Sequence, residues 1–372
     1  MPVVALGLGR QMTFWICALG AFVVAVWLLS PILLPFVGGM ALAYLFNPLA
    51  TRLERLGVSR LIASLAIVAA FVLAFVLIML LVAPVLGGQV AGLIENLPGY
   101  VRRLQSVITD PSIPWLRRLL GENFTTDATL NDFVTQGVGW MGTFLKSLWS
   151  GGAALVSLLS LLIVMPVVAF YMLNDWNRML VKTDSWVPLQ QRPTVRHLAR
   201  EVDEAIAAFV RGQTGVCLVL GSFYAIALSV AGLKFGLLIG LVSGLISFIP
   251  YVGSMTGLVL STSVAVAQFY PEWGHIAAVV AIFFAGQFLE GYVLQPKLVG
   301  ESVGLHPVWI IFAIFAFGYL FGFVGMLLAV PLAAAIAVFA RFALSRYLDS
   351  PFYTGEPIAA AEARPPSTIV VS

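Results

Sequence analysis

Glu290 is a carboxylate inside an otherwise apolar run, Gln287-Phe288-Leu289-Glu290-Gly291-Tyr292, and the next charge, Lys297, follows about two helical turns later. An ionised side chain near the centre of an apolar helix costs about 2.5 to 3.5 kcal/mol, so it needs a partner or a purpose. Two interpretations are open. The carboxylate binds a proton, a cation or a substrate, or it is an interfacial group held by a neighbouring helix end. The residues that we consider together as transport candidates are Glu290, Gln287, Gln295, Lys297, Pro250 and Gly253.

Motifs for intramembrane catalysis are missing from the sequence. A rhomboid-like serine protease needs Gly-x-Ser-Gly, and the nearest match, Leu241-Val242-Ser243-Gly244, begins with leucine. The predicted spans contain no aspartate for an aspartyl protease, and no Walker-type Gly-x-x-x-x-Gly-Lys-Ser/Thr loop occurs. Cys17 and Cys217 lie in apolar segments, which argues against a disulfide framework or a zinc cluster. We therefore predict no enzyme activity, no catalytic residue, no cofactor, no metal site and no ATP site.

The composition predicts a membrane protein. Of 372 residues, 60% are hydrophobic and only 10% are charged, whereas soluble domains carry about a quarter charged residues. Several stretches exceed the roughly 18 to 20 apolar residues that cross a bilayer, and runs such as 155–169 lack the alternation of a β-barrel strand. The basic residues stand in short connections, so the formal charge of +3 does not predict a nucleic-acid partner. We predict an all-α, polytopic helical protein with about eight membrane segments, some broken or re-entrant.

The distribution of prolines, charges and apolar runs divides the chain into four parts. Residues 1–88 are predicted N-terminal transmembrane helices, with a hairpin at Ser30-Pro31 because the residue before proline disfavours helix. Residues 89–150 are a predicted extramembrane or interfacial amphipathic module facing outward, 151–345 a transmembrane core, and 346–372 a disordered cytoplasmic tail. The Arg-rich and Lys-rich connections at 49–60 and 174–204 are predicted to be cytoplasmic, as are both termini.

Glycine and proline positions in the second half predict close packing and breaks. Gly236, Gly240 and Gly244 lie on one face of a predicted helix, as do Gly318 and Gly322, so both sets are predicted to let helix backbones approach within or between subunits. Pro250 and Gly253 interrupt the following segment and favour a broken helix. The stretch 308–342 is long enough to turn back on itself near its glycines.

The sequence 289–307, Leu-Glu-Gly-Tyr-Val-Leu-Gln-Pro-Lys-Leu-Val-Gly-Glu-Ser-Val-Gly-Leu-His-Pro, resembles the signature of the autoinducer-2 exporter (AI-2E) family, the PerM/TqsA-like permeases. Three further segments are similar to motifs of the same family: Phe248 to Gly253, Phe170 to Asp175, and Leu327 to Ala333. The chain departs from the family pattern at Ser254 and Leu260, near which many members have proline.

This resemblance implies about eight membrane segments, a homo-oligomer (a pentamer is known in the family) and export of small molecules that include autoinducer-2. Some members are associated with sodium/proton exchange instead. We therefore expect a multi-pass protein of a bacterial inner membrane that exports a small solute by secondary transport and whose partners are a small-molecule or ion substrate and the lipid bilayer. A sodium/proton antiporter and a non-transporting membrane scaffold are the alternatives.

Overall fold

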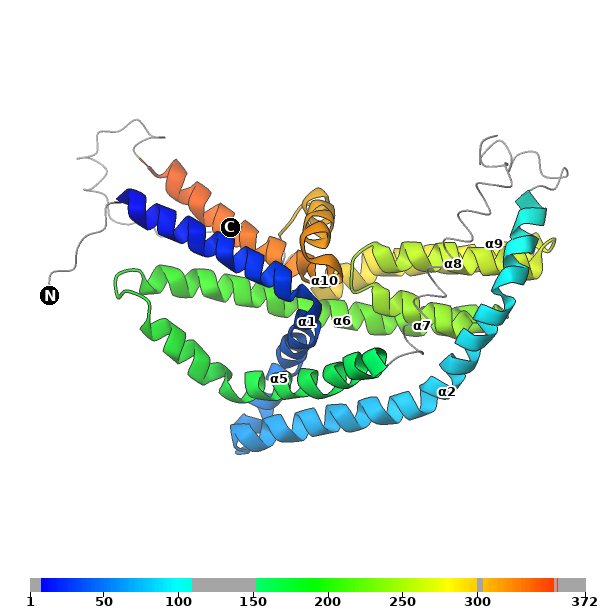
Figure 1. The fold of residues 1–372 in the computed structure, drawn as a ribbon, viewed down its shortest axis with the longest axis horizontal. Coiled ribbons are helices and arrows are strands. Elements are labelled where there is room, and N and C mark those ends of the chain that lie inside the picture. The colour runs from blue at the N-terminus through cyan, green and yellow to red at the C-terminus, as the bar shows by residue number, and fades with distance from the viewer. Residues whose placement is uncertain (1–7, 109–151, 300–303, 351–352, 354–372) are drawn as a thin grey trace.

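The computed structural model describes residues 8–108, 152–299, 304–350 and 353, and these residues form helices and short turns without a strand among them (Figure 1). The elements are α1 (Leu8–Arg55), α2 (Arg60–Ile108), α5 (Gly152–Ser185), α6 (Arg192–Val230), α7 (Gly236–Ile246), α8 (Val252–Phe269), α9 (Trp273–Leu289), the π-helix η2 (Glu290–Val299) and α10 (Pro307–Leu348). Among these residues, six stretches are long and apolar enough to cross a bilayer: Ile32–Arg55, Arg60–Leu104, Arg192–Val230, Val252–Phe269, Trp273–Val299 and Pro307–Leu348. The predicted all-α, polytopic fold is confirmed.

The first helix differs from the predicted helical hairpin. Helix α1 runs without interruption through Ser30-Pro31, and Figure 1 shows it changing direction partway along its length. Proline removes one backbone donor, but a helix in a membrane protein can absorb this loss as a kink. Its Gly38-Gly39 pair packs on α5, where a Cβ at Gly39 would stand 2.6 Å from Val168 Cβ. The two helices predicted on either side of Ser30-Pro31 are therefore one helix.

Helix α2 also continues past its predicted end. It passes through Gly87-Gly88 and contains Pro84 and Pro98 before it ends at Ile108. The two glycines keep a negative φ, since neither is among the residues with positive φ, so nothing in their conformation stops the helix. The first part of the module predicted at 89–150 thus belongs to α2, and its remainder from 109 onward lies outside the described residues.

Helices α6 and α7 cross at the glycine face of α7. A Cβ at Gly236 would stand 2.8 Å from the backbone of Leu228, and Cβ atoms at Gly240 and Gly244 would overlap the backbones of Ala225 and Gly221. All of these neighbours lie on α6 of the same chain. The glycines therefore bring two helices of one subunit into backbone contact.

The helix is interrupted between α7 and α8, as the sequence predicts. Helix α7 ends at Ile246 and α8 begins at Val252, and between them Tyr251 has a left-handed φ of 67°. Gly253 fits tightly behind the break, because a Cβ there would overlap the backbone nitrogen of Ser247. The break turns the two short helices back on each other beside α6 (Figure 1).

Helix α10 is a helical hairpin, in agreement with the expected reversal. Gly322 has a φ of 61° at the bend, and a Cβ at Gly325 would overlap the carbonyl oxygen of Phe317. Gly318 packs on Met326, but nothing lies within 4 Å of a Cβ at Gly322. The prediction of Gly322 as a packing residue is corrected: it supplies the left-handed conformation of the turn. Most of the tail predicted at 346–372 lies outside the described residues.

Candidate functional site

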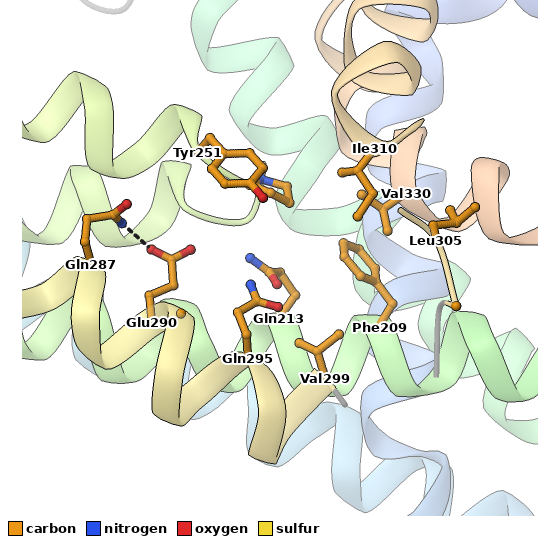
Figure 2. Close-up of a pocket in the computed structure, with 13 residues that line it drawn as sticks. Phe209, Gln213, Tyr251, Gln287, Glu290, Gln295, Val299, Leu305, Ile310 and Val330 are labelled. Carbon is orange, nitrogen blue, oxygen red and sulfur yellow. Dashed lines mark hydrogen bonds between the residues drawn. The ribbon is translucent and has the colours of Figure 1, made fainter. Parts of the chain in front are cut away.

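A cavity of about 590 Å³ lies between α6, the α7–α8 break, the α9–η2 junction and α10 (Figure 2). Figure 2 shows polar side chains on its one side and apolar side chains of α6, η2 and α10 on its other side. It is lined by Phe209, Gln213, Pro250, Tyr251, Gln287, Glu290, Gly291, Gln295, Val299, Gly304, Leu305, Ile310 and Val330. Broken or irregular backbone surrounds the cavity on several sides, at the α7–α8 break, in the π-helix and at the start of α10.

Glu290 is the acidic group of this cavity. Its side chain is 7% exposed, and its Oε2 accepts a hydrogen bond of 2.8 Å from Nε2 of Gln287, one turn earlier on α9. In the described part of the chain, no Lys, Arg or His side chain forms an ion pair with Glu290. An ionised Glu290 therefore has a neutral amide as its hydrogen-bond donor and no ion-pair partner among the described residues, and a bound cation or proton would complete the site.

The π-helix positions the second amide of the site. The residues that follow Leu289 continue α9 up to Val299 as the π-helix η2. Its wider turn bonds residues five apart, so Glu290 and Gln295 lie above one another on the same wall. Figure 2 shows both side chains pointing toward the cavity. Single π-helical turns occur frequently at functional sites.

Gln213 of α6 is a polar residue of the cavity that sequence reasoning missed. It is fully buried, and its Nε2 donates a 2.5 Å hydrogen bond to the carbonyl oxygen of Ser247 at the end of α7. Its Oε1 has no hydrogen-bond partner among the residues that the structure describes. The preceding Gly212 lets η2 approach, because a Cβ there would overlap the carbonyl oxygen of Leu298. The sequence offered one signal for Gln213, a polar residue at the start of an apolar span. This signal was missed because glutamine carries no charge.

The structure brings together some of the predicted candidates and separates others. Glu290, Gln287, Gln295 and Pro250 line the cavity. Gly253 lies behind the break against Ser247, and Lys297 is exposed on η2 and does not line the cavity. Among the described residues, the cavity lining therefore holds one carboxylate and three side-chain amides, without a basic side chain.

This set of groups suits particular ligands. A carboxylate with amide oxygens can hold a proton or a small cation, and amides both donate to and accept from hydroxyl groups. The same groups repel an anionic solute, since no cationic side chain among the described lining residues offsets Glu290. No group of three or more His, Cys, Asp or Glu side chains that could hold a metal ion occurs in the described ranges.

Comparison with known proteins identifies the family. Residues 16–345 match the family described as AI-2E family transporter. The chain is 30% identical to the provisionally named transport protein YrrI of Bacillus subtilis (strain 168), over 84% of this chain and 87% of YrrI. It is 28% identical to YueF of the same organism, over 84% of each chain, and 27% identical to the provisionally named permease PerM of Escherichia coli (strain K12), over 82% of this chain and 86% of PerM. A match over most of the length, together with a helical fold built for a bilayer, shows that this chain is a multi-pass membrane transporter of the AI-2E family.

Proposed function

We propose that this protein exports a small solute by secondary transport and that the Glu290 cavity is its binding site. The observation that carries the proposal is a buried carboxylate without an ion-pair partner in the described residues, facing a cavity ringed by helix breaks. Secondary transporters place their substrate and ion sites at discontinuous helices, where backbone irregularity is tolerated because it lines a cavity.

Because Glu290 is buried, its carboxylate is favourable only with a proton or cation bound, so this group can bind and release such an ion during the transport cycle. A bare carboxylate inside a span costs about 2.5 to 3.5 kcal/mol, a cost that binding of a proton or cation relieves. If the cavity opens alternately to the two sides, loading on one side and release on the other couple the ion to the solute. Glu290 is therefore proposed as the coupling residue, with Gln287 as its fixed hydrogen-bond donor.

The lining indicates the chemistry of the solute. Amides of Gln213, Gln287 and Gln295 would bind hydroxyl or carbonyl groups, and the apolar wall of Phe209 and Ile310 would cover carbon atoms. Such a site favours a small, polar, uncharged or cationic metabolite, including an autoinducer-2-like signal, over an anion. A bacterial inner membrane is the proposed location and outward movement the proposed direction. The homo-oligomer implied by the family, with a pentamer as the expected form, stays a prediction that native mass spectrometry decides.

A sodium/proton antiporter is the second candidate. It is favoured by the same Glu290, which has no ion-pair partner among the described residues, because a carboxylate can bind Na⁺ and H⁺ in turn. A comparison of spent medium from cells with and without the protein tests export, since an exporter changes the concentration of an organic metabolite. Proteoliposomes with an internal pH dye test exchange, since an antiporter moves protons when a sodium gradient is applied.

The substitution Glu290→Gln tests the role of the carboxylate. It keeps volume and hydrogen bonding but removes the charge, so flux per assembled protein should lose its dependence on pH or sodium while yield stays unchanged. Glu204→Gln, on the exposed surface of α6, is the matched control and should keep the wild-type dependence. Wild-type flux with wild-type ion dependence in Glu290→Gln would refute the coupling role, and lower yield with unchanged specific flux would indicate a structural role.

A further inference from the structure

A second cavity, of about 290 Å³, lies where the end of α1 meets α6. Its lining includes Arg52 and Arg55 from the last turn of α1, and Arg211 from α6. Asp203 of α6 and Tyr44 of α1 close the same cavity. It shares no lining residue with the Glu290 cavity, so it is a separate site.

The second cavity is strongly basic. Asp203, the one acidic group among its described lining residues, accepts a 2.9 Å hydrogen bond from the hydroxyl of Tyr44. Within the described residues, none of Arg52, Arg55 and Arg211 forms an ion pair. Arg211 donates its Nε to the carbonyl oxygen of Ala207 at 3.0 Å, which leaves its terminal N–H groups for another acceptor. In the part of the lining that the structure describes, three arginines thus stand against one carboxylate.

Helix-end electrostatics does not account for this arrangement. Basic residues in a last turn offset the negative end of the helix dipole, which explains Arg52 and Arg55. Arg211, however, lies in the interior of α6 and reaches the cavity from a different element. The nearby Glu54 is paired with Arg60 at 3.3 Å and does not neutralise the group. Like charges that share one cleft repel each other, and the attraction of a bound anion to the arginines would offset that repulsion.

We propose that this cleft binds a phosphate group, supplied by the headgroup of an anionic phospholipid. Guanidinium groups offer planar pairs of N–H donors that match phosphate oxygens, and hydrogen bonds to an ionised acceptor are the strong ones. The cleft lies at the Arg55 end of the candidate span Ile32–Arg55, and the ends of a spanning helix meet the headgroup region of a bilayer. The positive-inside rule predicts that this end is cytoplasmic, and basic pockets between helices on that side bind anionic headgroups. Free inorganic phosphate offers the same oxygens, so the experiment includes it as a separate probe.

Native mass spectrometry of the full chain in mild detergent tests the site, with phosphatidylglycerol, phosphatidylcholine and inorganic phosphate as probes. We expect tighter binding of phosphatidylglycerol than of phosphatidylcholine. Replacement of Arg52, Arg55 or Arg211 by Gln should weaken phosphatidylglycerol binding about fivefold each, and the triple variant about a hundredfold. Arg103→Gln, at an exposed position of α2 outside the cleft, is the matched control and should bind as the wild type does.

Four outcomes would overturn the proposal. Equal binding of the two lipids by the wild type, or wild-type affinity in the triple Gln variant for every probe, would reject the phosphate site. Binding of inorganic phosphate as tight as that of phosphatidylglycerol would reject the lipid source and assign the cleft to a soluble phosphate. A triple Lys variant keeps the charge, so it should bind more tightly than the Gln variant if both are folded, as circular dichroism can verify. Equal affinities of the two folded variants would reject the electrostatic basis of the site.

Discussion

Gly240→Ala is the substitution whose effect the structure predicts most directly. Gly240 lies in the middle of the α7 face that crosses α6, and a Cβ there would overlap the backbone nitrogen and Cα of Ala225. It would also stand 2.5 Å from the carbonyl carbon of Tyr224, whereas ordinary contacts of a Cβ begin at 3.4 Å. The obstacle is backbone, which cannot rotate away as a flexible side chain can. Helices α6 and α7 must therefore move apart by about 1 Å, judged from these two distances.

The cost follows from this separation. Inserting a methyl group into a well-packed site costs about 1 to 3 kcal/mol, and a gap of 0.5 to 1 Å forfeits about a quarter to a half of each dispersion contact across the interface. We expect about 3 kcal/mol from these effects at Gly240. Replacement of glycine by alanine inside a helix stabilises the helix by about 1 kcal/mol through its higher helix propensity. The net destabilisation is therefore about 2 kcal/mol.

Gly88→Ala is the matched control. Gly88 is also helical, in α2, but nothing lies within 4 Å of a Cβ at that position. Its substitution should be neutral or should stabilise the protein by up to about 1 kcal/mol. The two variants should therefore differ by about 2 to 3 kcal/mol in the free energy of unfolding.

Titration of the full chain with a denaturing detergent measures this difference. A thiol-reactive fluorophore can follow the separation of α6 and α7 through Cys217 on α6, in a Cys17→Ser background. Equal unfolding midpoints for Gly240→Ala and Gly88→Ala would refute the close α6–α7 contact. Loss of oligomer with unchanged subunit stability would instead place the glycine face between subunits.

Three further predictions concern orientation, pH and the solute site. A cysteine introduced at Leu56, which is 79% exposed in the α1–α2 turn, should react with a membrane-impermeant reagent in inside-out vesicles only, and labelling of intact cells would reverse the topology. Hydrogen bonds from Arg196 hold the pKa of Asp184 below its ordinary value of 3.8, so this pair stabilises the fold above that pH and the stabilisation is lost as pH falls through the lowered pKa. Asp184→Asn should therefore flatten the acid limb of a stability–pH curve, and an unchanged curve would contradict the assignment. Gln213→Met should raise the KM for the transported solute or ion about tenfold in proteoliposomes, because a buried amide is lost from the cavity, and an unchanged KM would exclude Gln213 from binding.

Local chemistry in the sequence was sufficient for the fold class and for the main irregularities. The scarcity of charge predicts helices in a bilayer, because a backbone without water must bond to itself. Pro250 and the glycines of the last long segment predict breaks, because proline lacks a donor and glycine permits positive φ. Glu290 was predictable as a candidate since a lone carboxylate in an apolar run is costly wherever the run is placed.

Tertiary structure decided which of these features meet. Helix α1 continues through Ser30-Pro31, and α2 continues through Gly87-Gly88. This continuity depends on packing of the residues on both sides of each dipeptide, which local preference does not reveal. Gln213 joined the site only because Gly212 lets η2 approach α6, a contact between residues far apart in the chain. The separation of Lys297 from the cavity likewise depends on which face η2 turns inward. Spacing along the sequence determines the period of a helix, but the direction of each face is set by the neighbours that it packs against.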